Sequence, residues 1–253
     1  MRPDGRSPDA LRPVTLEPGW QRQGDGSVLY RAGGTVVLCV ASVEEGVKDF
    51  LRGRNQGWVT AEYLMHPRAG ARRQNRDGFN GRSLSGRSHE IARLIGRSLR
   101  AAVDLGALGE RTITLDCDVL EADGGTRTAS ITGAMVALVL ALDGLARASK
   151  LPGRPLRTLV SAVSAGVYKH NPCLDLCYVE DRDAAMDLNL VATHDGAVVE
   201  LQCTAEHAPV PRSTVDALVD LGVKGCAALG AVQRETLKSA GVDLARLQRE
   251  PRG

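Results

Sequence analysis

Residues 123–130 read Asp-Gly-Gly-Thr-Arg-Thr-Ala-Ser, and they join a predicted strand to a predicted helix. Before them, residues 112–120 alternate between apolar and polar side chains, which is the pattern of a half-buried strand. After them, residues from about 128 to 149 are apolar on nearly every side of a helix, so we expect this helix to be buried between other elements. The strand, the glycine turn and the buried helix are therefore predicted to form the centre of the fold.

The same turn carries groups that bind anions. Its two glycines allow the backbone to come close to a ligand, and amides at the start of a helix point toward an anion. Thr126 offers a hydroxyl hydrogen bond, and the planar guanidinium of Arg127 suits phosphate oxygens. The alternative is an ordinary glycine turn in which Thr128 or Ser130 caps the helix, and local chemistry leaves the two interpretations even.

Arg87 strengthens the phosphate interpretation. It stands directly before Ser88, which we expect to cap a helix running to about Asp104, because apolar residues recur there at spacings of three and four. Two arginines at two helix starts, Arg87 and Arg127, would hold one small dianion between them. The alternative is that Arg87 is one more surface arginine of a basic loop.

Further strands and helices are predicted around this centre. The additional strands are 27–30, 35–43, 159–167, 174–179, 186–192 and 198–204. The additional helices are 212–228 and 231–240. Residues 53–86 have little periodicity and are predicted to form mostly a long basic loop. The order of elements predicts one α+β domain over 1–240 with two similar halves, followed by a disordered tail over 241–253.

Two aspartates flank a predicted connection between strands. Asp181 follows the end of one strand and Asp187 begins the next, so a short hairpin would bring the two carboxylates together. Such a pair suits Mg²⁺, which proteins usually hold by one or two carboxylates together with substrate phosphates. Asp116 and Asp118 compete for this role, because they share one face of the strand that leads into the glycine turn. For all four, solvated carboxylates at strand ends are an alternative.

Charge is divided unevenly along the chain, although the net charge is only +2. Residues 52–100 hold 11 Arg against 3 acids, a balance of +8, whereas residues 171–206 hold 8 acids against one Arg, a balance of −7. One segment therefore suits a polyanion and the other suits cations. Solvated surface is the alternative for each run taken alone.

Composition narrows the class of protein. Hydrophobic residues make up 43 % of the 253-residue chain, enough for a sizeable core. Aromatic residues make up only 3 %, so contacts to a nucleic acid, if the polyanion is one, would rely on charge more than on stacking. The six cysteines form no zinc-binding set and are expected to be mostly small buried thiols. We find no signal peptide and no charge-free apolar run of membrane-spanning length, so we expect a cytoplasmic protein without a membrane partner.

Six stretches between residues 1 and 133 resemble those of the ribonuclease PH family, in the right order, and the likeness continues to about residue 206. They are 1–7 (Met-Arg-Pro-Asp-Gly-Arg-Ser), 11–14 (Leu-Arg-Pro-Val), 44–46 (Glu-Glu-Gly), 57–63 (Gly-Trp-Val-Thr-Ala-Glu-Tyr), 114–120 (Thr-Leu-Asp-Cys-Asp-Val-Leu) and 123–133 (Asp-Gly-Gly-Thr-Arg-Thr-Ala-Ser-Ile-Thr-Gly). The resemblance implies the ribonuclease PH fold, an α+β fold with two β-α halves of the ribosomal protein S5 domain 2-like type. Beyond about residue 212 the likeness fades.

Roles for nine residues follow from the resemblance. Phosphate binding is implied for Arg87, Gly125, Thr126 and Arg127, catalysis and metal binding for Asp181 and Asp187, and RNA binding for Arg68, Arg73 and Arg76. The chain departs from the family at Cys203 and His207, which stand where glycines are expected.

The activity implied is that of a phosphate-dependent 3′→5′ exoribonuclease. It would remove 3′-terminal nucleotides from precursor tRNA, and from ribosomal RNA, as nucleoside diphosphates. Inorganic phosphate would be the co-substrate and Mg²⁺ or Mn²⁺ the metal. The assembly implied is a homo-hexamer, a trimer of dimers. Because the bonds broken and made are similar in energy, the reaction is expected to run backward as nucleotide addition.

Two rival functions use the same features. A hydrolytic Mg²⁺ nuclease would employ the carboxylates with water, but would have no use for a dedicated phosphate site. A non-catalytic subunit of an exosome-like ring would keep the fold and bind RNA, but such subunits often lack the site residues that are present here.

Overall fold

Two β-sheets carry the fold, one in each half of the chain, in a computed structural model that describes residues 1–79 and 83–249. The strands of the first sheet are β1 (Val14–Pro18), β2 (Gly26–Ala32), β3 (Thr35–Glu45), β4 (Trp58–Met65) and β5 (Arg111–Glu121). They lie in the order β1-β2-β3-β5-β4, with β4 and β5 parallel and the other pairs antiparallel. The strands of the second sheet are β6 (Val160–Tyr168), β7 (Asn171–Leu174), β8 (Met186–Thr193) and β9 (Val198–Ala205). They lie in the antiparallel order β7-β6-β8-β9.

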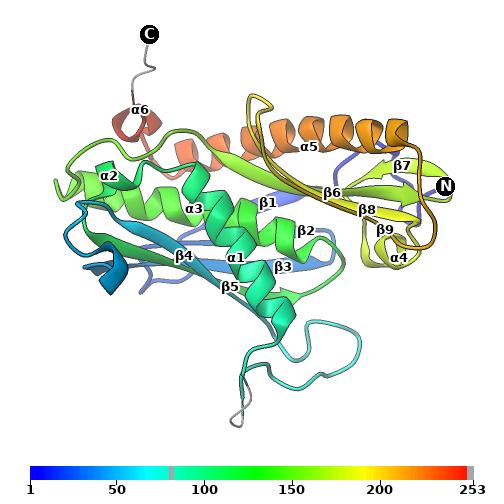
Figure 1. The fold of residues 1–253 in the computed structure, drawn as a ribbon, viewed down its shortest axis with the longest axis horizontal. Helices are drawn as coiled ribbons and strands as arrows, with labels where there is room; N and C mark the ends of the chain where they lie inside the picture. The colour runs from blue at the N-terminus through cyan, green and yellow to red at the C-terminus, as the bar shows by residue number, and fades with distance from the viewer. Residues whose placement is uncertain (80–82, 250–253) are drawn as a thin grey trace.

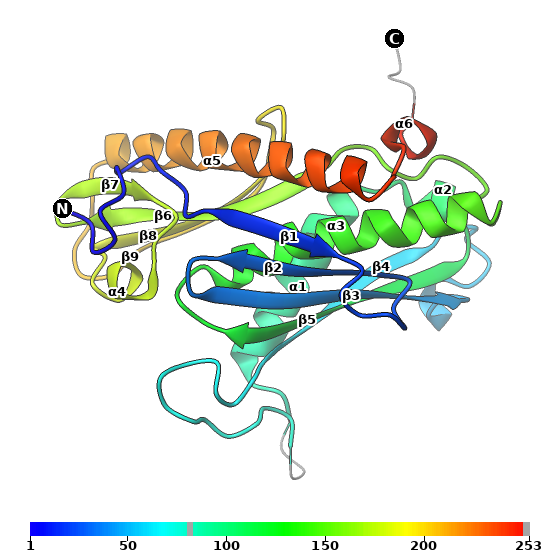
Figure 2. The ribbon, with the colours of Figure 1, turned by 180° about the vertical axis from the view of Figure 1, so that it is seen from behind.

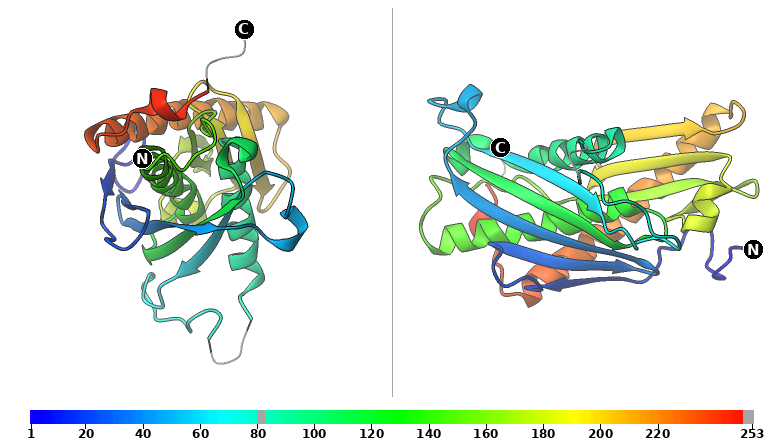
Figure 3. Two further views of the ribbon diagram at one scale, coloured as in Figure 1. Left: turned by 90° about the vertical axis from the view of Figure 1, so that its left-hand side faces the viewer. Right: turned by 90° about the horizontal axis from the view of Figure 1, so that it is seen from below.

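Helices separate and cover the two sheets. The long helices are α1 (Gly86–Ala101), α3 (Thr126–Arg147) and α5 (Arg212–Ser239), and the short ones are η1 (Asp49–Leu51), α2 (Leu105–Leu108), α4 (Tyr178–Arg182) and α6 (Leu244–Leu247). Figures 1, 2 and 3 show α1 and α3 between the sheets and α5 on the outer face of the second sheet. The structure thus confirms the predicted α+β fold with two β-α halves.

α3 is the central helix, as its apolar sequence predicts. It packs on β2 and β3 on one side and on β6 on the other, and Ile131, Met135, Leu138 and Leu142 are fully buried. The helix is long and apolar enough to cross a membrane, but 83 % of its most apolar window is buried inside the protein. It is therefore a core helix whose start is held between the two halves of the chain.

β4 corrects one sequence prediction. Residues 53–86 were expected to be mostly loop, but residues 58–65 form an edge strand parallel to β5. Val59, Ala61 and Tyr63 alternate toward the core, so the strand pattern is present but short, and it is masked by the surrounding glycines and arginines. The basic loop is therefore the shorter segment between β4 and α1, and its residues 66–79 extend below the body of the protein in Figure 1.

A second correction concerns the strand predicted over 174–179. β7 ends at Leu174, Asp175 adopts a left-handed backbone with φ of 53°, and residues 178–182 form the short helix α4. The carboxylate of Glu180 accepts a hydrogen bond from the backbone amide of Cys177 at 3.1 Å, which stabilises the helix start. Asp181 therefore lies on a helix and not at the end of a strand.

The C-terminal region differs from expectation in two ways. The two helices predicted over 212–240 are one continuous helix, α5. Gly230 lies within this helix, where a side chain would collide with His194. The tail predicted as disordered from residue 241 is folded as far as 249: Asp243 caps α6, and Leu247 is fully buried. Residues 250–253 lie outside the described residues.

Candidate functional site

A pocket of about 1180 Å³ opens where the two halves of the chain meet. Seven of the nine predicted site residues line it, namely Arg76, Arg87, Gly125, Thr126, Arg127, Asp181 and Asp187. They come from the basic loop, the starts of α1 and α3, the helix α4 and the start of β8. The pocket exceeds the roughly 300–1,000 Å³ typical of small-molecule sites, so it has room for the end of a polymer.

The glycine turn, residues 123–127, bends sharply into α3, and we call it the phosphate loop. Gly124 and Gly125 both have left-handed backbones, with φ of 78° and 66°. A Cβ at Gly124 would lie 2.5 Å from the carbonyl oxygen of Leu176, so only glycine fits there. The turn must be this tight for the loop to lie against the second half of the chain.

The start of α3 is available to an anion. Gly125 is the N-cap and contributes no side chain, and the first amides of a helix have no partners within it. The alternative caps are excluded, since Thr128 Oγ1 donates to the Gly125 carbonyl and Ser130 Oγ donates to the Thr126 carbonyl. The positive end of a 22-residue helix therefore faces the pocket through Thr126 and Arg127.

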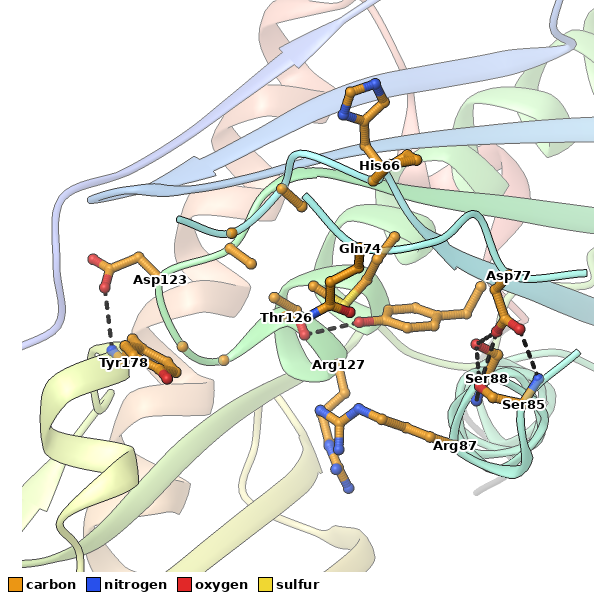
Figure 4. Close-up of a pocket in the computed structure, with 18 of the residues that line it drawn as sticks. His66, Gln74, Asp77, Ser85, Arg87, Ser88, Asp123, Thr126, Arg127 and Tyr178 are labelled. Atoms are coloured by element: carbon orange, nitrogen blue, oxygen red, sulfur yellow. Dashed lines mark hydrogen bonds between the residues drawn. The ribbon is translucent and has the colours of Figure 1, made fainter. Parts of the chain in front are cut away.

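Tyr63 supports the hydroxyl of Thr126. Its phenol oxygen lies 2.9 Å from Thr126 Oγ1, a hydrogen bond drawn at Thr126 in Figure 4. The ring is almost fully buried near the end of β4. Burial raises the pKa of Tyr63, so the phenol stays protonated and can donate to Thr126. When it does, the hydroxyl hydrogen of Thr126 is left for a ligand oxygen.

Arg87 and Arg127 point into the same part of the pocket, as Figure 4 shows. Arg127 is held from behind by the side-chain oxygen of Gln202 at 3.2 Å and by Glu90 at 3.8 Å. Arg87 forms no ion pair with any residue in 1–79 or 83–249. One guanidinium is thus oriented by the protein, and the other keeps its charge for a ligand.

The start of α1 differs from the start of α3. Its N-cap is Ser85 and not the predicted Ser88, and the carboxylate of Asp77 accepts hydrogen bonds from Ser85 N and Oγ and from Ser88 Oγ. A carboxylate of the protein thus already occupies this helix end. α1 therefore contributes the side chain of Arg87 and not its amides.

Three carboxylates from the second half of the chain also line the pocket, namely those of Asp181, Asp187 and Glu206. Burial raises the pKa of Asp181, and the nearby Arg127 and Arg87 partly offset that rise. Burial and then the charges of Asp181 and Glu206 raise the pKa of Asp187. The three groups repel one another, so a cation at this place would be stabilised.

The residues present fit a divalent metal ion. Asp187 Oδ1 is buried and has no hydrogen-bond partner among the described residues, which is unusual for a carboxylate oxygen. No three His, Cys, Asp or Glu side chains in the described parts of the chain form a complete ligand set. The site therefore fits Mg²⁺ or Mn²⁺ held by two carboxylates and completed by water and substrate oxygens.

The competing aspartates lie outside the pocket. Asp116 and Asp118 are on β5, on the face of the sheet that carries Glu62, and neither lines the pocket. Burial and the neighbouring carboxylates of Glu62 and Asp118 raise the pKa of Asp116. The pocket thus contains the phosphate loop together with Asp181 and Asp187, and it does not contain Asp116 or Asp118.

The arginines among the described residues of the basic loop are exposed, but they are not equivalent. Arg72 and Arg76 line the pocket, whereas Arg68 and Arg73 do not, and Arg68 donates to the carbonyl of Ala71 at 3.0 Å. His207, a departure from the family pattern, is exposed and also lies outside the pocket lining.

Sequence reasoning missed several residues of the site. Those with a clear structural role are Tyr63, Asp77, Gln202 and Glu206. Glu206 had a usable signal, because it follows the strand that pairs with the strand of Asp187, with Thr204 opposite that aspartate. The others depend on contacts between segments that no local pattern predicts.

Comparison with known proteins shows which family the chain belongs to. Residues 10–142 match the family described as the 3′ exoribonuclease family, domain 1. The chain is 55 % identical over 240 residues to the ribonuclease PH of Frankia casuarinae, and the match covers 94 % of each chain.

Solved structures share the fold at low sequence identity. The rice Rrp46 structure superposes with a TM-score of 0.75 at 18 % identity, covering 93 % of this chain and 100 % of that one. An Archaeoglobus fulgidus exosome structure, described as having RNA bound to the active site, superposes with a TM-score of 0.73 at 22 % identity, covering 94 % and 92 %.

Proposed function

Because the chain belongs to the ribonuclease PH family of 3′ exoribonucleases, we propose that it shortens RNA from the 3′ end by transferring each terminal nucleotide to inorganic phosphate. One observation carries this proposal: the start of α3, Arg87 and Arg127 share a single pocket with Asp181 and Asp187. A phosphate-binding helix start in the same pocket as a carboxylate pair suits phosphoryl transfer, in which catalysis is mostly positioning and charge stabilisation.

In the proposed reaction, phosphate is held by the phosphate loop and the two arginines. One of its oxygens attacks the phosphorus of the 3′-terminal phosphodiester in line with the leaving 3′ oxygen. The bond from that oxygen to phosphorus breaks, the oxygen takes a proton to become the new 3′ hydroxyl, and a nucleoside 5′-diphosphate is released. Arg87 and Arg127 stabilise negative charge on the phosphoryl oxygens throughout.

The metal site is part of the proposal. Asp181 and Asp187 would hold Mg²⁺ or Mn²⁺, which supplies charge stabilisation to the phosphoryl oxygens of the substrate. The unpartnered Oδ1 of Asp187 supports this assignment. Glu206 lies beside Asp187 and adds to the negative charge that attracts the cation.

The expected substrates are precursor tRNA 3′ ends, with ribosomal RNA precursors as a second group, acted on in the cytoplasm. We further propose that residues 1–240 act as a single catalytic domain and that the chain assembles as a homo-hexamer, a trimer of dimers. Family membership supports these assignments.

Phosphate dependence is the first test. We expect shortening of a 3′-tailed RNA to require added phosphate and to release nucleoside diphosphates, because the phosphate loop has no function in hydrolysis. The measurement is chromatography of the released nucleotides with and without phosphate. Release of nucleoside monophosphates at an equal rate without phosphate would favour the hydrolytic alternative, and no release in either buffer would favour a non-catalytic ring subunit.

The basic loop gives a second test. Replacing Arg68, Arg73 and Arg76 together by Ala should weaken binding of a long RNA and flatten its salt dependence, since contacts to backbone phosphates release counterions. Turnover of a very short oligonucleotide should change much less, because the phosphate loop and the carboxylates stay intact. Affinity and rate are measured for both substrates across a salt series. Equal losses on both would show that the loop shapes the site itself and would end the RNA-holding role.

A further inference from the structure

The N-terminal segment, residues 2–12, runs along the second half of the chain before it enters β1, beside β7 and α4 (Figure 2). Its Pro8 carbonyl accepts a hydrogen bond from Leu174 N at 2.7 Å. Two of its arginines, Arg2 and Arg12, are each only 5 % exposed, which is rare for arginine and requires that their charges be paired. The partners of Arg12 lie in both halves of the chain.

Arg12 ties the phosphate loop to the second half of the chain. Its Nε and Nη2 donate to the two carboxylate oxygens of Asp175 at 3.0 and 2.7 Å, and its backbone amide donates to the same carboxylate at 2.7 Å. Its Nη1 donates to the carbonyl of Asp123 at 2.6 Å, and its Nη2 lies 3.5 Å from the carbonyl of Gly124. One guanidinium thus holds a left-handed turn residue and two peptide groups of the phosphate loop together.

Thr35 holds the same two residues of the loop from β3. Its Oγ1 donates to the Gly124 carbonyl at 2.7 Å and accepts from the Asp123 amide at 3.0 Å. Thr35 is fully buried, so these bonds are shielded from water.

These contacts fix the direction of the loop amides. In a planar trans peptide the carbonyl and the following amide point in opposite directions. Because the carbonyls of Asp123 and Gly124 are held toward Arg12 and Thr35, the amides of Gly124 and Gly125 point the other way. Both glycines line the pocket. The arginine behind the loop therefore selects which polar groups the loop presents to a ligand.

The loop is also locked to α4. Asp123 Oδ1 accepts from the amide of Tyr178 at 3.2 Å, and Gly124 packs against the backbone of Leu176 and Cys177. Glu180, one residue before Asp181, forms a bidentate pair with Arg2 at 2.7 Å for both bonds. A displacement of the loop would therefore be transmitted to the helix that carries Asp181.

We propose that Arg12 is a positioning residue of the phosphate site, acting with Thr35 to orient the amides of Gly124 and Gly125 toward the attacking phosphate. This inference rests on the proposed phosphorolytic function and assigns the N-terminal segment to the active site. Arg12 does not touch the substrate; it acts through the backbone of the loop.

The test separates phosphate affinity from stability and from RNA binding. Arg12→Lys keeps the charge, but a single ammonium cannot span Asp175 and the two carbonyls. We expect the KM for phosphate to rise about tenfold, the effect of one lost charge-assisted hydrogen bond, while the KM for a short RNA stays unchanged. Calorimetric titration of the protein with inorganic phosphate, without RNA, should show the same loss of affinity.

Two further variants keep the result decisive. Thr35→Val removes the second support of the loop without touching the ion pair and should also raise the KM for phosphate, so it decides the question if Arg12→Lys does not fold. Asp143→Asn is the control: it removes the buried carboxylate that pairs with the exposed Arg147 at the far end of α3, and it should lower thermal stability only.

The possible results separate the positioning role of Arg12 from the phosphate site itself. An unchanged KM for phosphate in both Arg12→Lys and Thr35→Val, with a large rise in Arg127→Ala, would overturn the positioning role and leave the phosphate site standing. An unchanged KM in all three variants would overturn the phosphate site as well. A rise in Asp143→Asn equal to that in Arg12→Lys would show a general effect of lost stability and would also overturn the positioning role.

Discussion

Asp187→Asn is expected to lower the rate of phosphorolysis by roughly a thousandfold while leaving RNA binding intact. Losing a ligand of the proposed metal removes several kcal/mol of charge stabilisation in the transition state, and about 1.4 kcal/mol corresponds to a factor of ten. The substitution keeps the size of the side chain. Burial and the charge of Asp181 raise the pKa of Asp187, which means that the negative charge is unfavourable there, so the fold should tolerate its removal. Single-turnover rates and filter-binding affinities are the measurements.

Asp116→Asn is the matched control for this variant. Asp116 is also a half-buried strand aspartate with a raised pKa, but it lies outside the pocket. The rate of phosphorolysis by Asp116→Asn should stay close to that of the unmodified protein. A severe loss in Asp116→Asn together with normal turnover in Asp187→Asn would move the metal site to β5.

Arg87→Ala and Arg127→Ala should each reduce phosphorolysis strongly, and the double variant should be inactive. Each change removes charge-assisted contacts to phosphate of roughly 1.5–3 kcal/mol, which corresponds to a loss of about ten- to a hundredfold, and more if the contacts strengthen in the transition state. The loss in Arg127→Ala should be the larger, because this arginine is oriented by Gln202 and Glu90. Initial rates over a phosphate series measure both effects.

Arg93→Ala is the control for the arginines, because Arg93 is exposed on α1 and does not line the pocket. It should behave like the unmodified protein at every phosphate concentration. Near-normal rates at saturating phosphate in both Arg87→Ala and Arg127→Ala would contradict the proposed clamp on phosphate.

The centre of the fold was predictable from local pattern. In β5, Ile113, Leu115, Cys117 and Val119 alternate into the core as the sequence indicates, and α3 is buried on all sides as its composition requires. The tight turn was also predictable, because paired glycines before an apolar helix favour one, but local pattern left open whether the helix start is free or capped by Thr128 or Ser130.

Other parts of the site could not be predicted from local pattern. Residues 174–179 are apolar enough to suggest a strand, but the left-handed turn at Asp175 is stabilised by Arg12, which lies 163 residues away in the chain. The N-cap of α1, Ser85, likewise depends on a contact outside its own helix, because its hydroxyl donates to Asp77. Asp77 lies in the basic loop, whose sequence has no periodicity that would predict this contact. A local sequence pattern reflects only the propensity of a segment for helix or strand. These contacts form because distant segments meet in the folded protein, so no local pattern predicts them.

The ion pair between Arg2 and Glu180 joins residues that are 178 positions apart. Synthesis on the ribosome proceeds at roughly 5–20 residues per second. Glu180 is therefore made about 10–35 s after Arg2. A nascent chain that ends before Asp175 already contains the phosphate loop, but it has neither the carboxylate that pairs with Arg12 nor the helix against which Gly124 packs. The pocket is therefore complete only after the second half of the chain has been made.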